Sequence, residues 1–259
     1  GLKGGLLDAG ILLNLDTEDD DELTIGCAGG IDVSAGGKYK VEKASSGSCG
    51  FRLTVRGLTG GHSGMDIYKG RANANKLINR VLLSAKEKFD LRISVIDGGG
   101  LRNAIPRESF AEVVIPAADA DAFIALIKEE EKILQAEYKT TDPKLNIAAE
   151  KINTPDMVMV AAYQYALLRT IGACPNGIYR MSPEINGLVQ TSNNLARVLV
   201  KDGGFKILCL TRSSVDSEKM DLAKTICYNF EMAGAKPEFG GSYPGWAPKP
   251  DAPIVKLMS

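Results

Sequence analysis

The residue with the clearest potential for chemistry is His62, the only histidine among the 259 residues. Imidazole is the side chain whose unperturbed pKa lies closest to neutral pH, so it can gain or lose a proton under physiological conditions. His62 lies in the glycine-flanked sequence Gly60-Gly61-His62-Ser63-Gly64, between a strand-like run, 51–56, and a helix-like run that begins near residue 67. Glycine permits close approaches that other residues resist, so such a loop could present the ring to a ligand. A purely structural histidine is the alternative, which the pentapeptide by itself favours.

Asp16 is a second candidate, because it follows a short apolar run, 11–15, and begins the acidic sequence 16–22. The apolar run predicts a buried strand, and carboxylates at strand ends line the ligand crevice of open α/β sheets. Aspartate is also a common ligand of zinc and of hard metal ions. The alternative is that Asp16 merely starts a solvated acidic turn, which the local sequence by itself favours.

Two further side chains, Asn103 and Arg212, are placed where they could bind a substrate. Asn103 follows three glycines, 98–100, that predict a turn, and its amide could donate to a substrate oxygen. The usual alternative is a hairpin turn in which the asparagine bonds its own backbone. Arg212 ends a predicted strand, 205–211, where a planar guanidinium suits bidentate capture of a carboxylate. An exposed arginine on a sheet edge is an equally good interpretation of that position.

Composition limits the class of protein. The chain is 44% hydrophobic and 24% charged, which suits a soluble globular protein with one large core or two smaller ones. Its 31 basic and 32 acidic residues leave a net charge of -1, so there is no general electrostatic case for nucleic acid or an anionic membrane. No apolar run approaches the roughly 20 residues of a membrane span. The five scattered cysteines predict reduced thiols in a cytoplasmic protein and no structural zinc site.

Hydrophobic periodicity in the first half predicts the order β-α-β-β-α. The expected strands cover 51–56, 91–96 and 109–115, and the expected helices cover 67–88 and 119–138. One face of the second helix should point to the core through Phe123, Leu126, Ile127, Ile133 and Leu134. In the second half, we expect a helix from Thr154-Pro155 to about residue 170, strands over 188–200 and 205–212, a helix over 217–233 and a strand that includes 237–239.

Two successive units of similar content predict an α+β fold in which an antiparallel sheet is covered by helices. No repeat is visible at the level of residues, so duplication is a weaker inference. Signatures of several other catalytic classes are absent: there is no G-x-S-x-G elbow, no P-loop and no Rossmann fingerprint in its required context. A single histidine is also too few for a complete dinuclear metal site.

Taken together, the motifs resemble the aminoacyl-histidine dipeptidases, a branch of the dinuclear zinc exopeptidases that also include the carnosinases. The likeness runs in the same order along nearly the whole chain. The segments that carry it are Asn14-Leu15-Asp16-Thr17-Glu18, Ile25–Gly30, Gly60–Gly64, Asn73–Leu77, Leu101–Glu108, Pro175-Asn176-Gly177, Arg212-Ser213 and Tyr243–Trp246.

The resemblance implies a role for each candidate. Asp16 is similar to a zinc-ligand aspartate of the catalytic domain, and His62, Asn103 and Arg212 are similar to lid residues that reach the substrate. In the whole enzyme, two zinc ions would hold and acidify a bridging water. A glutamate outside this sequence would take the water proton, and His62 would stabilise the tetrahedral oxyanion. Asn103 would add a neutral hydrogen bond, and Arg212 would bind the carboxylate of the dipeptide.

The resemblance also implies a domain organisation in which the sequence is a segment of a longer enzyme. Residues 1–29 would end one piece of the catalytic domain, 30–243 would form the lid domain, and 244–259 would return to the catalytic domain. We therefore expect this segment to be inactive and metal-free by itself, and the parent to be a cytoplasmic zinc dipeptidase acting on Xaa-His and similar dipeptides. A homodimer is compatible with this, whereas nucleic acid and membranes are not expected partners. The alternative from another class is a non-catalytic α+β dimerisation module, whose exposed edge strand would mediate association.

Overall fold

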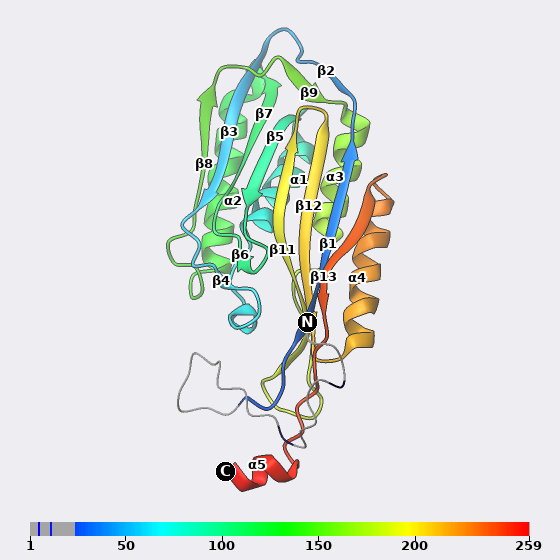
Figure 1. Ribbon diagram of the computed structural model, residues 1–259. Coiled ribbons are helices and arrows are strands. Elements are labelled where there is room, and N and C mark those ends of the chain that lie inside the picture. The colour runs from blue at the N-terminus through cyan, green and yellow to red at the C-terminus, as the bar shows by residue number, and fades with distance from the viewer. Residues whose placement is uncertain (1–4, 6–10, 12–23, 259) are drawn as a thin grey trace.

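The computed structural model describes residues 5, 11 and 24–258. Its main element is a nine-stranded antiparallel sheet in the order β13-β1-β12-β11-β5-β7-β3-β8, with β10 paired to β11 (Figure 1). The strands are β1 (Gly29–Lys38), β3 (Ser48–Arg56), β5 (Arg92–Gly99), β7 (Ser109–Pro116), β8 (Asn146–Ile152), β10 (Gly177–Met181), β11 (Val189–Lys201), β12 (Gly204–Ser213) and β13 (Lys236–Tyr243). Among the described residues, no helix is both long and apolar enough to cross a membrane.

Four helices pack side by side in the order α2-α1-α3-α4 and form one layer against the sheet. They are α1 (Ala74–Lys88), α2 (Ala120–Glu137), α3 (Ala161–Ala173) and α4 (Asp216–Glu231). The shorter elements are β2 (Val41–Lys43), β4 (Gly61–His62), η1 (Ile67–Lys69), β6 (Ala104–Ile105), η2 (Ala117–Asp119), β9 (Met157–Met159) and α5 (Pro253–Met258). The expected α+β class, an antiparallel sheet covered by helices, is therefore confirmed.

The sheet and helices divide into two units of the same topology. The first unit follows the chain as β3-α1-β5-β7-α2-β8, and its strands lie in the order β8-β3-β7-β5. The second unit follows the chain as β1-α3-β11-β12-α4-β13, and its strands lie in the corresponding order β13-β1-β12-β11. The first unit is thus inserted after the first strand of the second. Strands β5 and β11 join the units through the register Gly99 to Arg197.

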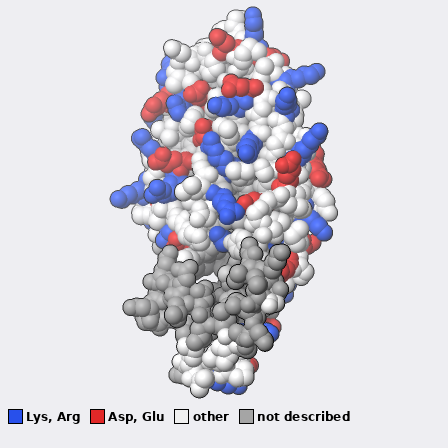
Figure 2. All heavy atoms as spheres, viewed as in Figure 1, with Lys and Arg blue, Asp and Glu red and all other residues white. Residues whose placement is uncertain are grey.

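The two faces of the sheet differ in chemistry because side chains alternate along each strand. On β3, Phe51 is buried beneath the helices, and its ring lies 5.2 Å from that of Phe123 on α2. The neighbouring residue Arg52 points the other way and forms an ion pair with Glu112 on β7. Acidic and basic side chains are interspersed over the face seen in Figure 2. The apolar stripes of the helices therefore cover one face only, and the opposite face carries polar groups.

Two helix starts differ from the expectation. The helix predicted over 67–88 is interrupted, because Gly70 adopts a left-handed φ of 63° and α1 begins only after Asn73. The side-chain oxygen of Asn73 caps α1 by accepting from the backbone N–H groups of Asn75 and Lys76. The predicted start at Thr154-Pro155 is wrong. The chain there leads into β9, which pairs with β2, and α3 begins at Ala161.

Three strands, β1, β8 and β10, and the exposure of one side chain were not expected from periodicity. Strand β1 has only a short alternation of Ile31, Val33 and Ala35 between two pairs of glycines, β8 has three polar residues among its seven, and β10 is mostly exposed. Ile133, expected in the core, is 41% exposed on the far side of α2. The glycines of the predicted turn at 98–100 also differ, since the first two belong to β5. The apolar run 11–15, expected as a strand, lies outside the described residues apart from Ile11.

Candidate functional site

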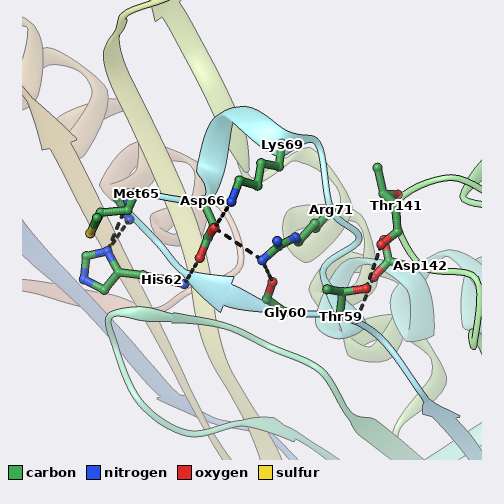
Figure 3. Close-up of polar contacts among 10 residues, drawn as sticks. Thr59, Gly60, His62, Met65, Asp66, Lys69, Arg71, Thr141 and Asp142 are labelled. Atoms are coloured by element: carbon green, nitrogen blue, oxygen red, sulfur yellow. Dashed lines mark hydrogen bonds and ion pairs between the residues drawn. The ribbon is translucent and has the colours of Figure 1, made fainter. Parts of the chain in front are cut away.

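The imidazole of His62 is held in one orientation by the loop that follows it. Strand β4 pairs with β6, which sets His62 opposite Ala104. The ring folds back so that Nδ1 accepts the backbone N–H groups of Gly64, at 3.2 Å, and Met65, at 3.1 Å (Figure 3). A neutral imidazole whose Nδ1 accepts carries its proton on Nε2. The half-buried ring can therefore donate from Nε2, which has no hydrogen-bond partner in the described part of the chain.

Asp66 fixes the backbone of the same loop. Its Oδ2 accepts the backbone N–H of His62 at 2.8 Å, and its Oδ1 accepts from Lys69 Nζ at 2.7 Å. Arg71 adds a second cation, with Nη1 at 3.4 Å from Asp66 Oδ1 and at 2.5 Å from the carbonyl oxygen of Gly60. The hydrogen bond from Lys69 and then that from His62 N hold the pKa of Asp66 below its usual 3.8. The loop therefore depends on an ionised carboxylate.

Asp142 ties together the two ends of this loop. Its Oδ1 accepts the backbone N–H of Thr59 and its Oδ2 accepts that of Ala72, both at 2.8 Å. The hydroxyl of Thr59 also donates to the carbonyl oxygen of Thr141 at 2.7 Å. Asp142 is 1% exposed, so its carboxylate is buried, and the bond from Ala72 is made away from water. Figure 3 shows this anchor on one side of the loop and the His62 ring on the other.

Arg212 lies near the end of β12, opposite Gly30 on β1, as the sequence predicts. Its Nη1 donates to the hydroxyl of Tyr243 at 2.8 Å, whereas its Nε is buried without a partner among the described residues. The missing side chain at Gly30 makes this contact possible, because a Cβ there would lie 2.7 Å from the Tyr243 ring. The guanidinium therefore keeps an unused donor at Nε, on the edge with which an arginine pairs to a planar anion such as a carboxylate.

Gly64 brings His62 and Arg212 into one place. A Cβ on Gly64 would lie 3.2 Å from His62 Cε1 and 3.4 Å from Arg212 Nε. The imidazole and the guanidinium therefore flank the same point, although 150 positions separate the two residues in the sequence. A donor that can meet an oxyanion and a cation that can meet a carboxylate thus lie on either side of a glycine.

Asn103 lies beside this pair in the loop between β5 and β6. Its carbonyl oxygen accepts the backbone N–H of Ser63 at 2.7 Å, which connects it to the residue after His62. Its side chain is exposed and makes no hydrogen bond within the described residues, so the expected alternative of bonding to its own backbone is not the arrangement found. The amide is free to meet a ligand.

Asp16 lies outside the described residues, so the structure does not place it relative to the other three. Among the described residues, no group of three or more histidine, cysteine, aspartate or glutamate side chains could hold a metal ion. This part of the chain therefore does not fit a zinc site. The five cysteines are free thiols, and Cys174 Sγ lies 3.7 Å from Cys209 Sγ in the core.

Sequence reasoning identified His62, Asn103 and Arg212 but missed the residues that hold them. Tyr243 was noted only as part of a motif, and Asp142 not at all. The sequence does not show that Gly30 and Tyr243 are in contact, because they meet only when β1 and β13 lie side by side in the sheet. Asp142 follows two threonines in a polar stretch that is typical of any surface turn.

Comparison with known proteins shows which families and structures this chain resembles. Residues 44–142 match the family model of the peptidase dimerisation domain of the M20 group. The match begins just before β3 and ends at Asp142, so it covers most of the first unit and the whole His62 loop. This part of the chain is therefore similar to an M20 peptidase dimerisation domain.

Two individual proteins resemble the chain over its whole length. The cytosol non-specific dipeptidase of Escherichia coli (strain K12) is 38% identical over 258 residues, which are 100% of this chain and 53% of that protein. The crystal structure of aminoacylhistidine dipeptidase from Vibrio alginolyticus superposes with a TM-score of 0.95 at 39% identity, covering 99% of this chain and 52% of that one. The resemblance to the aminoacyl-histidine dipeptidases is confirmed, and the chain spans about half the length of these relatives.

Proposed function

We propose that the chain is the substrate-binding lid of a dipeptidase that hydrolyses Xaa-His and similar dipeptides. The observation that carries the proposal is the placement of His62 and Arg212 on either side of Gly64. A dipeptide has one scissile carbonyl and one terminal carboxylate a few ångströms apart, which suits one neutral donor and one guanidinium held close together. The names of the two relatives, both dipeptidases, support the same substrate class.

Each side chain has a distinct task in this proposal. The Nε2–H of His62 donates to the carbonyl oxygen, and the bond strengthens as negative charge develops on that oxygen in the transition state. The Nε–Nη2 edge of Arg212 pairs with the terminal carboxylate, while Tyr243 holds Nη1. Asn103 donates a neutral hydrogen bond to the substrate. A longer peptide places no carboxylate at this distance from its first peptide bond, so the arrangement favours very short substrates.

The domain boundaries expected from the sequence form part of the proposal. In this arrangement, residues 30–243 form the lid, and 1–29 and 244–259 belong to the catalytic domain. The geometry of the sheet supports it, because β1 begins at Gly29 and β13 ends at Tyr243. Just beyond those points, Cys27 and Trp246 pair through two backbone hydrogen bonds of 3.2 and 2.8 Å. The chain thus enters and leaves the lid at one place, as an inserted domain does.

Metal binding is assigned to the whole protein. We infer two zinc ions per active site, with Asp16 as one ligand, from the resemblance alone. Because the described residues do not provide a zinc site, no step of the proposal passes through the metal. The cytoplasm is the proposed location, which the name of the Escherichia coli relative and the five free thiols support.

A second proposed role is association into a homodimer. The matched family model is described as a dimerisation domain, which supports this role directly. The outermost strands β8 and β13 also leave one side of each backbone unpaired among the described residues, and such edges can pair with another chain. Sedimentation equilibrium of the whole protein tests the role, and a monomer at micromolar concentration would contradict it.

The decisive test of the substrate-binding role is a double-mutant cycle between enzyme and substrate. In the whole protein, wild type and Arg212→Leu are assayed on an Xaa-His dipeptide and on the same dipeptide with an amidated carboxyl terminus. Each change alone should lower kcat/KM, but the two together should cost little more than either one, because both remove the same ion pair. Arg52→Leu is the matched control on the open face. Losses that simply multiply would show that Arg212 does not bind the carboxylate.

A further inference from the structure

The loop that carries Asn103 belongs to the first unit and is hydrogen-bonded to a buried side chain of the second unit. Asn194 on β11 is 1% exposed. Its Nδ2 donates to the carbonyl oxygen of Arg102 at 3.2 Å and to that of Ala104 at 2.8 Å. These two carbonyl groups belong to the residues on either side of Asn103. One amide group therefore fixes the backbone before and after the proposed substrate-binding residue.

The orientation of the Asn194 amide is itself determined by its neighbours. Its Oδ1 accepts from Asn73 Nδ2 at 3.4 Å. Asn73 cannot turn its own amide round, because its Oδ1 caps α1 by accepting the backbone N–H groups of Asn75, at 3.0 Å, and Lys76, at 3.3 Å. The helix cap thus directs the oxygen of Asn194 towards Asn73 and its NH2 group towards the loop.

The same constraint reaches His62. The residue after Asn103, Ala104, pairs with His62 in the β4–β6 ladder, and Asn103 O accepts the backbone N–H of Ser63. A displacement of the Asn103 loop would therefore displace the backbone on both sides of the His62 side chain. A second attachment supports the loop from β1, where Asp32 Oδ2 lies 2.6 Å from Arg102 Nη1.

We propose that Asn194 is a positioning residue that aligns the Asn103 and His62 loops with Arg212. The inference deepens the proposed function and rests on it for its catalytic consequence. Asn194 and Arg212 both belong to the second unit, on adjacent strands, whereas Asn103 and His62 belong to the first. The hydrogen bonds of Asn194 are therefore a direct link between the two halves of the proposed site. A misplacement of about 1 Å at such a site can cost about 10²-fold in rate.

The test replaces Asn194 by leucine, which has a similar shape and no donor. The matched control is Asn79→Leu, because Asn79 is equally buried in α1 and donates to Leu168 O, away from the site. Asn194→Asp provides a second, isosteric variant in case the leucine variant fails to fold, since an ionised carboxylate cannot donate to the two carbonyl oxygens.

The structural readout needs no activity. His62 is the single histidine, so its ring nitrogens give one unambiguous NMR spin system in the 259-residue chain. We expect Asn194→Leu to accelerate exchange of the Ser63 amide at least about 10-fold relative to the slowest core amides, and to shift the His62 ring signals. The control variant should change neither. Unchanged Ser63 exchange in both Asn194 variants would overturn the proposal.

The catalytic readout is made in the whole protein. We expect Asn194→Leu to lower kcat by about 10-fold to 10²-fold while KM for the dipeptide changes less than threefold, because Arg212 keeps its place. Normal kcat in a variant whose Ser63 amide exchanges faster would overturn the catalytic consequence. A wild-type protein without dipeptidase activity would overturn the proposed function instead, and faster Ser63 exchange would still establish the positioning role.

Discussion

Replacing Asp142 by asparagine should loosen the loop that carries His62, from Thr59 to Ala72, although no residue of that loop is changed. The carboxylate accepts one backbone N–H at each end of the loop, from Thr59 and from Ala72, both at 2.8 Å. Asparagine has the same shape, but one of its two terminal atoms is an NH2 group. Whichever way the amide turns, it brings a donor against one of the two backbone N–H groups, which then loses its acceptor.

The magnitude follows from the two bonds. A hydrogen bond to a charged group contributes about 1.5–3 kcal/mol, and one such bond is lost in the variant. The other changes from a charged to a neutral acceptor, which roughly halves it and costs about 1 kcal/mol more. We therefore expect a loss of about 2–4 kcal/mol in the free energy of unfolding. A typical domain has about 5–15 kcal/mol of stability, so the variant should fold but unfold at clearly lower denaturant.

Urea unfolding of the 259-residue chain, followed by circular dichroism, measures this loss. Asp90→Asn is the matched control, because Asp90 is largely exposed and its one ion pair among the described residues is with Lys86 across 3.3 Å, so its removal should cost less than about 1 kcal/mol. A loss below about 0.5 kcal/mol for Asp142→Asn would refute the argument that Asp142 anchors the loop. Loss of the same size for both variants would refute it equally.

The remaining predictions concern the site itself. His62→Ala in the whole protein should lower kcat by about 10²–10³-fold with little change in KM and normal thermal stability; near-normal turnover would show that the ring does not meet the transition state. Arg212→Lys should raise KM for dipeptides, because lysine keeps the charge but lacks the planar fork; unchanged kinetics would exclude Arg212 from substrate binding. Tyr243→Phe should raise KM less than Arg212→Lys, since it frees Nη1 but leaves the Nε–Nη2 edge; an equal effect would place Tyr243 in direct contact with substrate. The stability that Asp66 gives over Asp66→Asn should be present above about pH 4 and decrease as pH falls further, because its pKa is lowered in the fold; a gap that stays the same as pH falls through the acid range would contradict this.

Strong periodicity identified the elements whose side chains alternate or form one apolar stripe. Two examples are β3, found from the alternation of Phe51, Leu53 and Val55, and α2, found from its apolar stripe. Both could be predicted from the sequence because burial on one face selects apolar residues at those positions. Strand β1 could not be found in this way. Its sequence, GGIDVSAGGK, alternates only over Ile31, Val33 and Ala35, and the pair of glycines at each end of that run makes the alternation too short to stand out.

The site could be predicted in part for a comparable reason. His62 and Arg212 were identifiable because their side chains have distinctive chemistry, and the resemblance placed them in a shared function. Asp142 and Asn194 act by accepting from or donating to backbone groups that lie 70 or more positions away. Backbone groups look alike in any sequence, so no motif reveals these partners. Only the fold identifies which carboxylate or amide is buried against which loop.

The junction between the two units explains why a glycine stands at position 99, which the sequence alone assigns to a turn. At the β5–β11 pairing, a Cβ on Gly99 would lie 1.9 Å from the carbonyl oxygen of Ala196, where β11 bulges. Arg197, the next residue, donates from Nη1 to Gly99 O at 3.1 Å and so holds the register of the pairing. A slip of one residue would turn every side chain of the strand to the opposite face. Because His62 belongs to the first unit and Arg212 to the second, the close approach at Gly99 sets whether they meet. The glycine at the end of β5 is therefore needed for the two units to join in the register that gives both side chains one site.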